Sequence, residues 1–310
     1  MISVYKQNNM KKKTLLITGA SGFLGSNIKT LLSENYRIET IGLSEEDDIR
    51  VNLAHATPKI SKKYDVILHA AGKAHMEPKS DKEKKSFFEV NLQGTINLCN
   101  SLEKSGLPES FIFISSVAVY GLEYGELITE DFPANPKTAY GVSKFQAELF
   151  LQKWCKIHGV KLGIIRPSLI AGPNPPGNLG AMINGIKSGK YLSINGGAAK
   201  KSVLMVDDIA RLVPLLEKKS GIYNVCDSKQ PTFRELEKVI ACQLHKSTPK
   251  SIPYPVAKVL AKFGDYLGHI VPINSNKLTK ITVSLTFSNE KARKELGWEP
   301  LKVVDNFRIS

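Results

Sequence analysis

Tyr140 and Lys144 stand one helical turn apart, in the run Tyr-Gly-Val-Ser-Lys. Side chains at this spacing lie on the same face of a helix. An ammonium group beside a phenol favours the phenolate, so the pair predicts a tyrosine pKa below its ordinary value of about 10. Such a phenol can exchange a proton with a sugar or alcohol hydroxyl near neutral pH. Solvated helix surfaces show the same spacing, so the sequence upstream decides between the two interpretations.

A glycine-rich turn supplies that context. It follows the apolar run 15–17, which predicts a buried strand, and it precedes a segment with helical spacing. Gly19 permits the tight turn, Gly22 lets the backbone approach a pyrophosphate, and Gly25 lets the helix pack against the strand. The amide groups and the dipole at the start of that helix favour phosphate binding. The predicted cofactor residues of this turn are Gly19, Ser21, Gly22, Phe23, Leu24 and Gly25.

TGASGFLG at 18–25 and YGVSK at 140–144 together resemble the extended short-chain dehydrogenase/reductase family. That family includes NAD-dependent nucleotide-sugar epimerases, dehydratases and ketoreductases. The resemblance covers the chain from about Lys11 to Trp298. The other matching stretches are DVILHAAG (65–72), VNLQGT (90–95), FIFISSVAVYG (111–121), IIRPSLIAGP (164–173) and KARKELGW (291–298).

Apolar strand candidates alternate with helical segments through the first half of the chain. This alternation predicts an α/β fold with a doubly wound parallel Rossmann sheet. Glycine and proline cluster at 167–180, where we expect the chain to leave for a smaller C-terminal substrate-binding lobe. The predicted division is a disordered tail at 1–10, a dinucleotide-binding domain at 11–170 with a return segment at about 203–226, and a substrate-binding lobe at 171–202 and 227–310.

The resemblance assigns the catalytic roles. Ser116 corresponds to the family's catalytic serine, which binds the reacting sugar oxygen, and Ser115 is expected to line the cofactor. Tyr140 would move the hydroxyl proton while the nicotinamide takes or gives a hydride. Lys144 would hold the ribose hydroxyls. The resemblance also implies cofactor contacts from Asn52, Leu53, Ala70, Ala71, Gly72, Asn91, Tyr140, Lys144, Pro167 and Ser168.

The end of the second predicted strand leaves the choice between NAD and NADP open. NAD-preferring members of the family carry an acidic residue there, which binds the ribose 2′-hydroxyl. This chain has Gly42 at that position, and acidic residues appear only at 45–48. No arginine that would favour a 2′-phosphate follows directly.

Asn178, Leu179 and Lys201 are expected to bind the diphosphate of a nucleotide sugar, most simply a UDP-linked one. Val117 and Ala118 stand where dehydratases of the family carry an Asp-Glu pair, and neither can carry a proton. The favoured reaction is therefore 4-epimerisation of a UDP-hexose or UDP-N-acetylhexosamine. A 4-keto-reductase of a deoxy-sugar nucleotide is the alternative, and a non-catalytic dinucleotide sensor is a third hypothesis.

The composition sets outer limits. The net charge is +14, but the lysines are scattered and no nucleic-acid-binding module accompanies them, so no nucleic-acid partner is expected. No apolar run is long enough to span a membrane, and the four cysteines show neither paired nor metal-binding spacing. We expect a cytoplasmic enzyme without a metal. The family analogy adds a homodimer and a role in polysaccharide biosynthesis.

One C-terminal segment has an apolar stripe opposite Lys258 and Lys262. A basic amphipathic helix of this kind can lie on a membrane surface. The favoured interpretation is nevertheless a helix that packs its apolar stripe on its own lobe. The stripe consists of Val256, Val259, Leu260, Phe263, Leu267 and Ile270.

Overall fold

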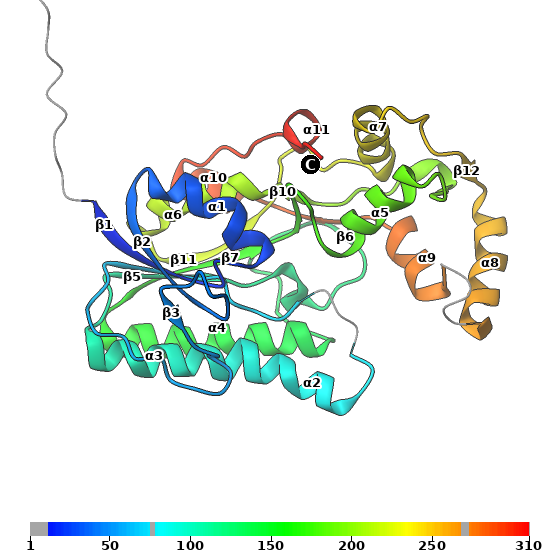
Figure 1. The fold of residues 1–310 in the computed structure, drawn as a ribbon. Helices are drawn as coiled ribbons and strands as arrows, with labels where there is room; N and C mark the ends of the chain where they lie inside the picture. The colour runs from blue at the N-terminus through cyan, green and yellow to red at the C-terminus, as the bar shows by residue number, and fades with distance from the viewer. Residues whose placement is uncertain (1–11, 75–77, 268–272, 310) are drawn as a thin grey trace, which may run out of the picture.

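A parallel sheet of seven strands runs through the centre of the protein (Figure 1). The computed structural model describes residues 12–74, 78–267 and 273–309. The strands of the sheet are β1 (Lys13–Thr18), β2 (Tyr36–Gly42), β3 (Ile49–Arg50), β4 (Val66–His69), β5 (Ser110–Ile114), β7 (Lys161–Pro167) and β11 (Gly221–Val225). Their spatial order is β11-β7-β5-β4-β1-β2-β3. The order reverses between β1 and β4, where doubly wound folds form their ligand crevice. The predicted fold class is confirmed.

Helices cover both faces of the sheet, as Figure 1 shows. One face carries α1 (Phe23–Ser33), α6 (Val206–Leu216) and α10 (Glu290–Leu296), and the other carries α3 (Gly94–Ser105) and α4 (Ala139–His158). A separate hydrophobic core fills the space on each face. Strands that are buried on both sides need apolar residues on both sides, which explains unbroken runs such as the buried segment Ser110–Ile114.

The helical region before β5 differs from the prediction. The sequence predicted one helix over 82–104. The structure has α2 (Asp81–Phe88), a π-helix (Glu89–Gln93) and then α3. A π-helix widens one turn and redirects a side chain, and such turns are frequent at functional sites. Here the widened turn contains Asn91, whose side chain is fully buried.

The remaining elements form the part of the molecule beyond the carboxyl ends of the sheet strands. Its core is built largely from α5 (Gly177–Lys187), α7 (Phe233–Gln243) and α11 (Val303–Asn306). The short strands are β6 (Gly125–Ile128), β8 (Leu169–Ala171), β9 (Ser193–Ile194), β10 (Val203–Met205), β12 (Ser251–Ile252) and β13 (Leu285–Phe287). The predicted residue limits of the two lobes stay a prediction, and the predicted tail lies outside the described residues. None of the helices in 12–74, 78–267 and 273–309 is long and apolar enough to cross a bilayer.

The predicted apolar stripe lies on helix α8 (Tyr254–Leu267). The prediction that this stripe packs on its own lobe was wrong. Ala257 and Ala261 are fully buried, whereas Val259 and Phe263 are 56% and 57% exposed. Small residues let α8 approach its neighbours closely, and the large apolar side chains point away from them. The side chain of Leu267 and the whole of Ile270 lie outside the described residues.

Candidate functional site

The glycine turn forms a cradle at the carboxyl end of β1. Gly19 has a φ of +75°, and a Cβ on it would lie 2.7 Å from the backbone of Ala71. A Cβ on Gly25 would lie 2.4 Å from the carbonyl oxygen of Gly19. Both positions therefore require glycine. Helix α1 begins at Phe23, and its N-cap residue Gly22 has no side chain that could occupy the free amide groups. Those amides can donate to a pyrophosphate, so the cradle fits a dinucleotide.

Lys144 lies beside the loop that follows β4. Its Nζ donates to the carbonyl oxygen of Ile114, at 2.9 Å, and lies 4.8 Å from the centre of the Phe113 ring. A Cβ on Gly72 would lie 2.8 Å from the same Nζ, so only glycine leaves the ammonium room there. Two parts of the predicted site, one from the loop and one from α4, therefore meet.

Asn91 fixes this meeting point. Its amide nitrogen donates to Ser143 Oγ at 2.8 Å, and its Oδ1 accepts from the backbone amide of Lys73 at 2.8 Å. The side chain thus ties α4, one residue before Lys144, to the loop after β4. The π-helix makes this contact possible. The contact holds the loop after β4 against α4, beside the expected cofactor site.

Ser116 and Tyr140 come together at the mouth of the same site. Their side chains lie near enough for the Ser116 hydroxyl to lower the pKa of Tyr140. Ser116 follows β5 and caps a short 3₁₀ helix (Val117–Tyr120) by accepting from the amide of Ala118 at 3.1 Å. Tyr140 lies in the first turn of α4, which Thr138 caps. Two capped helix starts therefore hold the hydroxyl and the phenol in register.

The predicted lowering of the tyrosine pKa was wrong in direction. Burial raises the pKa of Tyr140 above its ordinary value, and the nearby hydroxyl of Ser116 lowers it only in part. Burial also lowers the pKa of Lys144 to about 8, and the carboxylate of Glu148 opposes this shift. Desolvation is therefore the main cause of both shifts.

A buried ionic network lies under the site and was not predicted. Glu148 and Arg166 form two hydrogen bonds, of 3.0 Å from Nε and 2.6 Å from Nη2, and both residues are buried. Ser115 donates its hydroxyl to Glu148. Because the hydroxyl of Ser115 binds Glu148, the backbone of Ser115 is the part that can line a cofactor. Arg166 also donates to the hydroxyl of Tyr120 at 3.0 Å. The one signal of this network in the sequence was that Glu148 and Arg166 are charged residues among apolar neighbours.

His69 occupies the buried end of β4. Its ring nitrogens are hydrogen-bonded to Thr18 at 2.6 Å and to Thr95 at 2.9 Å. Burial, with a smaller effect from Lys144, lowers the pKa of His69 to about 3. The ring is therefore neutral at physiological pH, and it joins β1, β4 and α3 beneath the glycine cradle.

Gly42 ends β2, as predicted, but an acid does reach this position. A Cβ on Gly42 would lie 2.2 Å from Oδ2 of Asp47. The turn that brings Asp47 back is closed by Oδ2 of Asp47, which accepts from the amide of Ser44 at 2.9 Å. The carboxylate therefore occupies the space that an acidic side chain of residue 42 would fill. Sequence alignment could not find it, because the turn geometry sets its position.

The other predicted cofactor residues line the same edge. Asn52 is exposed and accepts from the amide of Ala54 at 3.0 Å, so its amide group remains available. Leu53 is buried in the core, and its carbonyl oxygen accepts from the side-chain amide of Asn97 at 2.7 Å. Ser168 follows Pro167 at the end of β7, and its buried hydroxyl has no hydrogen-bond partner among the described residues.

The predicted diphosphate residues lie on two elements of the second lobe. Helix α5 begins at Gly177, so Asn178 is exposed in its first turn while the side chain of Leu179 is buried. Lys201 precedes β10, and burial lowers its pKa to about 8. No carboxylate of the described residues pairs with Lys201. A partly desolvated ammonium without a counterion is suited to an anionic ligand.

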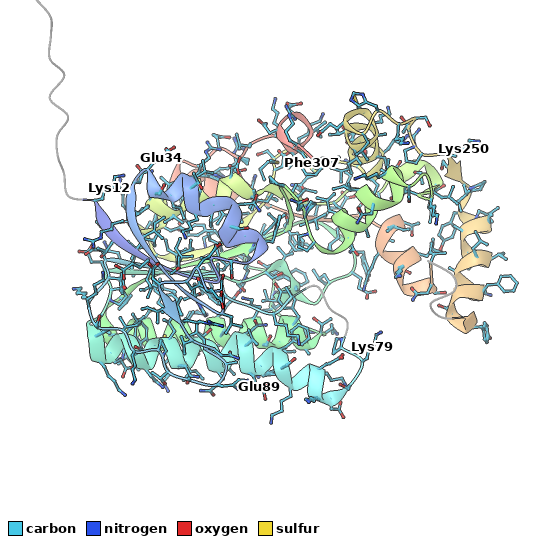
Figure 2. The ribbon with its side chains drawn as sticks, viewed as in Figure 1. Lys12, Glu34, Lys79, Glu89, Lys250 and Phe307 are labelled. Atoms are coloured by element: carbon cyan, nitrogen blue, oxygen red, sulfur yellow. The ribbon has the colours of Figure 1, made fainter. Side chains whose placement is uncertain are left out.

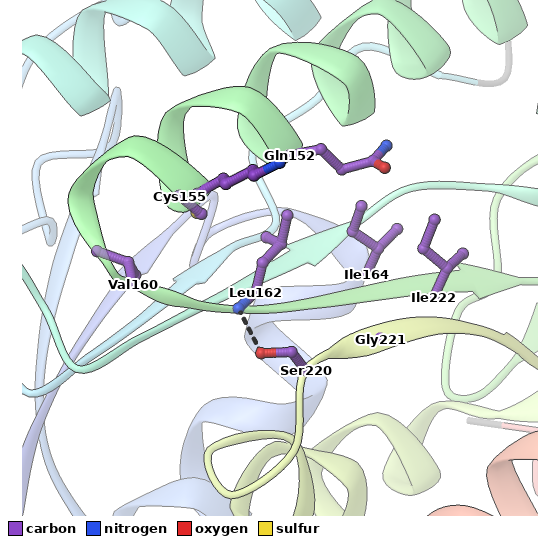
Figure 3. A pocket seen from close by; sticks show the side chains of 9 residues that line it. Gln152, Cys155, Val160, Leu162, Ile164, Ser220, Gly221 and Ile222 are labelled. Atoms are coloured by element: carbon purple, nitrogen blue, oxygen red, sulfur yellow. Dashed lines mark hydrogen bonds between the residues drawn. The ribbon is translucent and has the colours of Figure 1, made fainter.

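A groove of about 360 Å³ lies elsewhere, between α4 and the edge of the sheet (Figure 3). Figure 3 shows the hydrogen bond from the amide of Leu162 to Ser220 that closes one side. None of the predicted site residues lines this groove. Its lining residues are Gln152, Cys155, Lys156, Val160, Leu162, Ile164, Ser220, Gly221 and Ile222.

The geometry can be compared with known proteins. Residues 15–226 match the model of the NAD dependent epimerase/dehydratase family. This match spans more than half of the chain and includes the glycine cradle, Ser116, Tyr140 and Lys144. The chain belongs to the NAD-dependent epimerase/dehydratase family. It is thus an enzyme of a family that acts on nucleotide sugars with NAD or NADP, and the predicted resemblance is confirmed.

Two curated members of the family are similar over most of their length. The chain is 28% identical over 297 residues to N-acetyl-alpha-D-glucosaminyl-diphospho-ditrans,octacis-undecaprenol 4-epimerase of Escherichia coli O157:H7, covering 89% of this chain and 88% of that protein. It is 29% identical over 311 residues to UDP-glucose 4-epimerase of Vibrio cholerae, covering 93% and 91%. The substrate and the reaction are not determined at this identity.

A solved member of the family has the same fold. RMD from Pseudomonas aeruginosa, complexed with NADPH, superposes with a TM-score of 0.72 at 22% identity and covers 96% of both chains. At this identity the likeness shows the fold alone. The family's cofactor carries the hydride, and the glycine cradle together with Lys144 would hold it here.

Tyr140→Phe tests the assigned proton carrier. Without the phenolic hydroxyl, the sugar hydroxyl has no proton acceptor, and kcat is expected to fall by about 10²- to 10⁴-fold. Binding of the dinucleotide, followed by nucleotide fluorescence, is expected to change little. Tyr124→Phe is the matched control, because Tyr124 is 74% exposed. Near-normal turnover of Tyr140→Phe would remove Tyr140 from the mechanism.

Lys144 makes stability depend on pH in a defined window. Its pKa is about 8 in the folded protein against an ordinary 10.5, so between these values the unfolded chain binds more protons. Its contribution to the free energy of unfolding therefore rises with pH across this window, by about 3 kcal/mol at most. Denaturant unfolding of wild type and Lys144→Met at about pH 7 and about pH 10 measures it. The wild type should gain stability relative to the variant at the higher pH, and an unchanged difference would contradict the lowered pKa.

Proposed function

We propose that this enzyme is a 4-epimerase of a diphosphate-linked hexose or N-acetylhexosamine, with the UDP-linked sugar as the leading substrate. The observation that carries the chemistry is the approach of the Ser116 hydroxyl to Tyr140, which lies on the same helix as Lys144. An alcohol and a phenol that lie this close can bind one sugar oxygen together. The two similar curated relatives are both named as 4-epimerases, which supports the position of attack.

In the proposed reaction, the Tyr140 phenolate would accept the proton of the sugar 4-hydroxyl, and Ser116 would donate to the developing carbonyl oxygen and stabilise its charge. The raised pKa of Tyr140 makes its phenolate a stronger base for this step and its phenol a weaker acid for the return of the proton. A nicotinamide held by the glycine cradle, with its ribose hydroxyls on Lys144, would supply the hydride chemistry at the same carbon. Inversion requires the keto sugar to turn in the pocket before the hydride returns to its other face.

Asp47 favours NAD over NADP. Its carboxylate takes the place of the acid that NAD-preferring enzymes carry at the end of the second strand. It can accept a hydrogen bond from the ribose 2′-hydroxyl, and it would repel a 2′-phosphate. An epimerase needs a cofactor that it regenerates itself, and it gains nothing from selecting the reduced NADP pool. This preference therefore supports epimerisation over reduction.

Reduction of a 4-keto-sugar is the second candidate. The solved structure with the same fold holds NADPH, which is the cofactor that a biosynthetic reductase uses. Dehydration has weaker support, since Val117 and Ala118 lie in the 3₁₀ helix after Ser116 and carry no titratable group. A sensor without turnover would not require Ser116 and Tyr140 to lie close together.

A homodimer through α4 is part of the proposal. Leu149 and Ile157 are 51% and 67% exposed on this helix, and a second copy would cover them. Large apolar side chains on one helix face are commonly buried by a partner.

The reaction is tested with a panel of UDP-hexoses, UDP-N-acetylhexosamines and an N-acetylhexosamine on undecaprenyl diphosphate. Inversion of the sugar with catalytic NAD and no net change in NADH absorbance is the expected result. Stoichiometric consumption of NADPH on a 4-keto-sugar would instead identify the reductase. Loss of water from the sugar would identify a dehydratase. Dinucleotide binding without any sugar conversion would support the sensor.

Asp47→Asn tests the cofactor preference. The amide oxygen keeps the hydrogen bond to Ser44, while the negative charge is lost. The ratio of the Kd for NADP to that for NAD, measured by calorimetry, is expected to fall by about 10- to 100-fold, as for the loss of a hydrogen bond to a charged group. Glu46→Gln is the matched control, since Glu46 is an exposed acid of the same turn. An unchanged ratio would show that Asp47 does not face the ribose.

A further inference from the structure

Helix α8 presents three faces with different chemistry. Ala257, Ala261 and Gly264 are buried against the rest of the lobe. Their packing partners in the same core include Ile194 and Leu278 of helix α9 (Ser275–Thr282). Because the contact uses small residues, α8 lies close to its neighbours without burying any described large side chain of its own.

The opposite side of α8 is an apolar face. Its large side chains are between 40% and 91% exposed, which is unusual for one continuous helix face. Figure 1 shows α8 at the outer end of the molecule, far from the α3 and α4 helices, and Figure 2 shows side chains that project outward from it. The apolar face of α8 consists of Val256, Val259, Leu260, Phe263 and Tyr266.

The edge of this face is basic. Lys258 and Lys262 are exposed and form no ion pair with any described residue. Residues 238–289 contain seven lysines and one acidic residue, Asp265. The carboxylate of Asp265 accepts from the amide of Ser275 at 2.9 Å and stays negatively charged, so it offsets one lysine. By composition, lysines outnumber acids in this segment by six.

We infer that the apolar face of α8 docks on the surface of an anionic lipid bilayer. A helix that has large apolar and aromatic side chains on one face and lysines at its edge can lie in the interfacial plane of a membrane. Phe263 and the other apolar side chains would enter the acyl boundary, while Lys258 and Lys262 would meet lipid phosphates. Tyr266 has the amphipathic ring that is enriched at this depth.

A second copy of the chain fits this face less well. A symmetric contact through α8 would bring the lysines of both copies together. The segment offers one acid against seven lysines, and like charges in an interface oppose association. Charge complementarity therefore selects an anionic partner. The inference is independent of the reaction proposed above, because none of these residues belongs to the catalytic site.

The experiment is co-sedimentation of the full-length protein with vesicles. Vesicles of phosphatidylglycerol and phosphatidylethanolamine are compared with vesicles of phosphatidylcholine alone, at low and high salt. The wild type is expected to bind the anionic vesicles at least about tenfold more strongly, and high salt should weaken this binding. Val259→Ser combined with Phe263→Ser should lose at least about tenfold in vesicle affinity. Lys258→Gln combined with Lys262→Gln should lose the preference for anionic lipid.

Tyr124→Ser is the matched control for an exposed large side chain, because Tyr124 is 74% exposed and lies outside α8. It should bind vesicles like the wild type. Thermal unfolding of each variant checks the fold, and the substituted residues are solvent-exposed. Wild-type protein that stays in the supernatant with anionic vesicles at low salt would overturn the inference. So would vesicle binding that the Val259/Phe263 variant retains, or a change in oligomeric state as the sole effect of that variant.

Discussion

The buried ion pair between Glu148 and Arg166 holds the parts of the site in one place. It joins α4, which carries Tyr140 and Lys144, to β7, which leads to Pro167 and Ser168. Two hydrogen bonds of 3.0 and 2.6 Å connect the charges, and Ser115 and Tyr120 satisfy further positions. A buried pair is expensive to desolvate and is maintained only when its geometry is complete. It therefore fixes the orientation of α4 more strictly than apolar packing alone would.

The site combines this rigid base with desolvated titratable groups. Burial raises the pKa of Tyr140 and lowers the pKa of Lys144 and of Lys201. The charged form of each group is therefore less stable than it is in water. Such groups respond strongly to a charged ligand that enters the site. The neutral ring of His69 and the amide of Asn91 lie near Lys144. Each is hydrogen-bonded to a neighbouring element, His69 to Thr95 and Asn91 to Ser143. Catalytic groups at the surface of the sheet thus rest on a polar layer with few unsatisfied atoms.

The second lobe differs from this base in how it uses its surface. Helix α5 presents Asn178 at an exposed helix start, and α8 turns its large apolar residues outward. This part of the molecule therefore exposes polar and apolar side chains for contacts with ligands. Under the proposed function, substrate recognition would fall on this part and the chemistry on the sheet.

The Rossmann sheet, the glycine cradle and the family could be predicted from the sequence, because strand periodicity and glycine spacing are local properties. Ser116 and Tyr140 could likewise be named as candidates for one site. The direction of the Tyr140 pKa depends on the fold, since desolvation depends on what surrounds the group. The fold also brings Asp47 into the space beside Gly42 and turns the stripe of α8 outward. These outcomes depend on how the turn after β2 closes and on which face of α8 packs against its neighbours. Neither can be read from the order of residues along one segment.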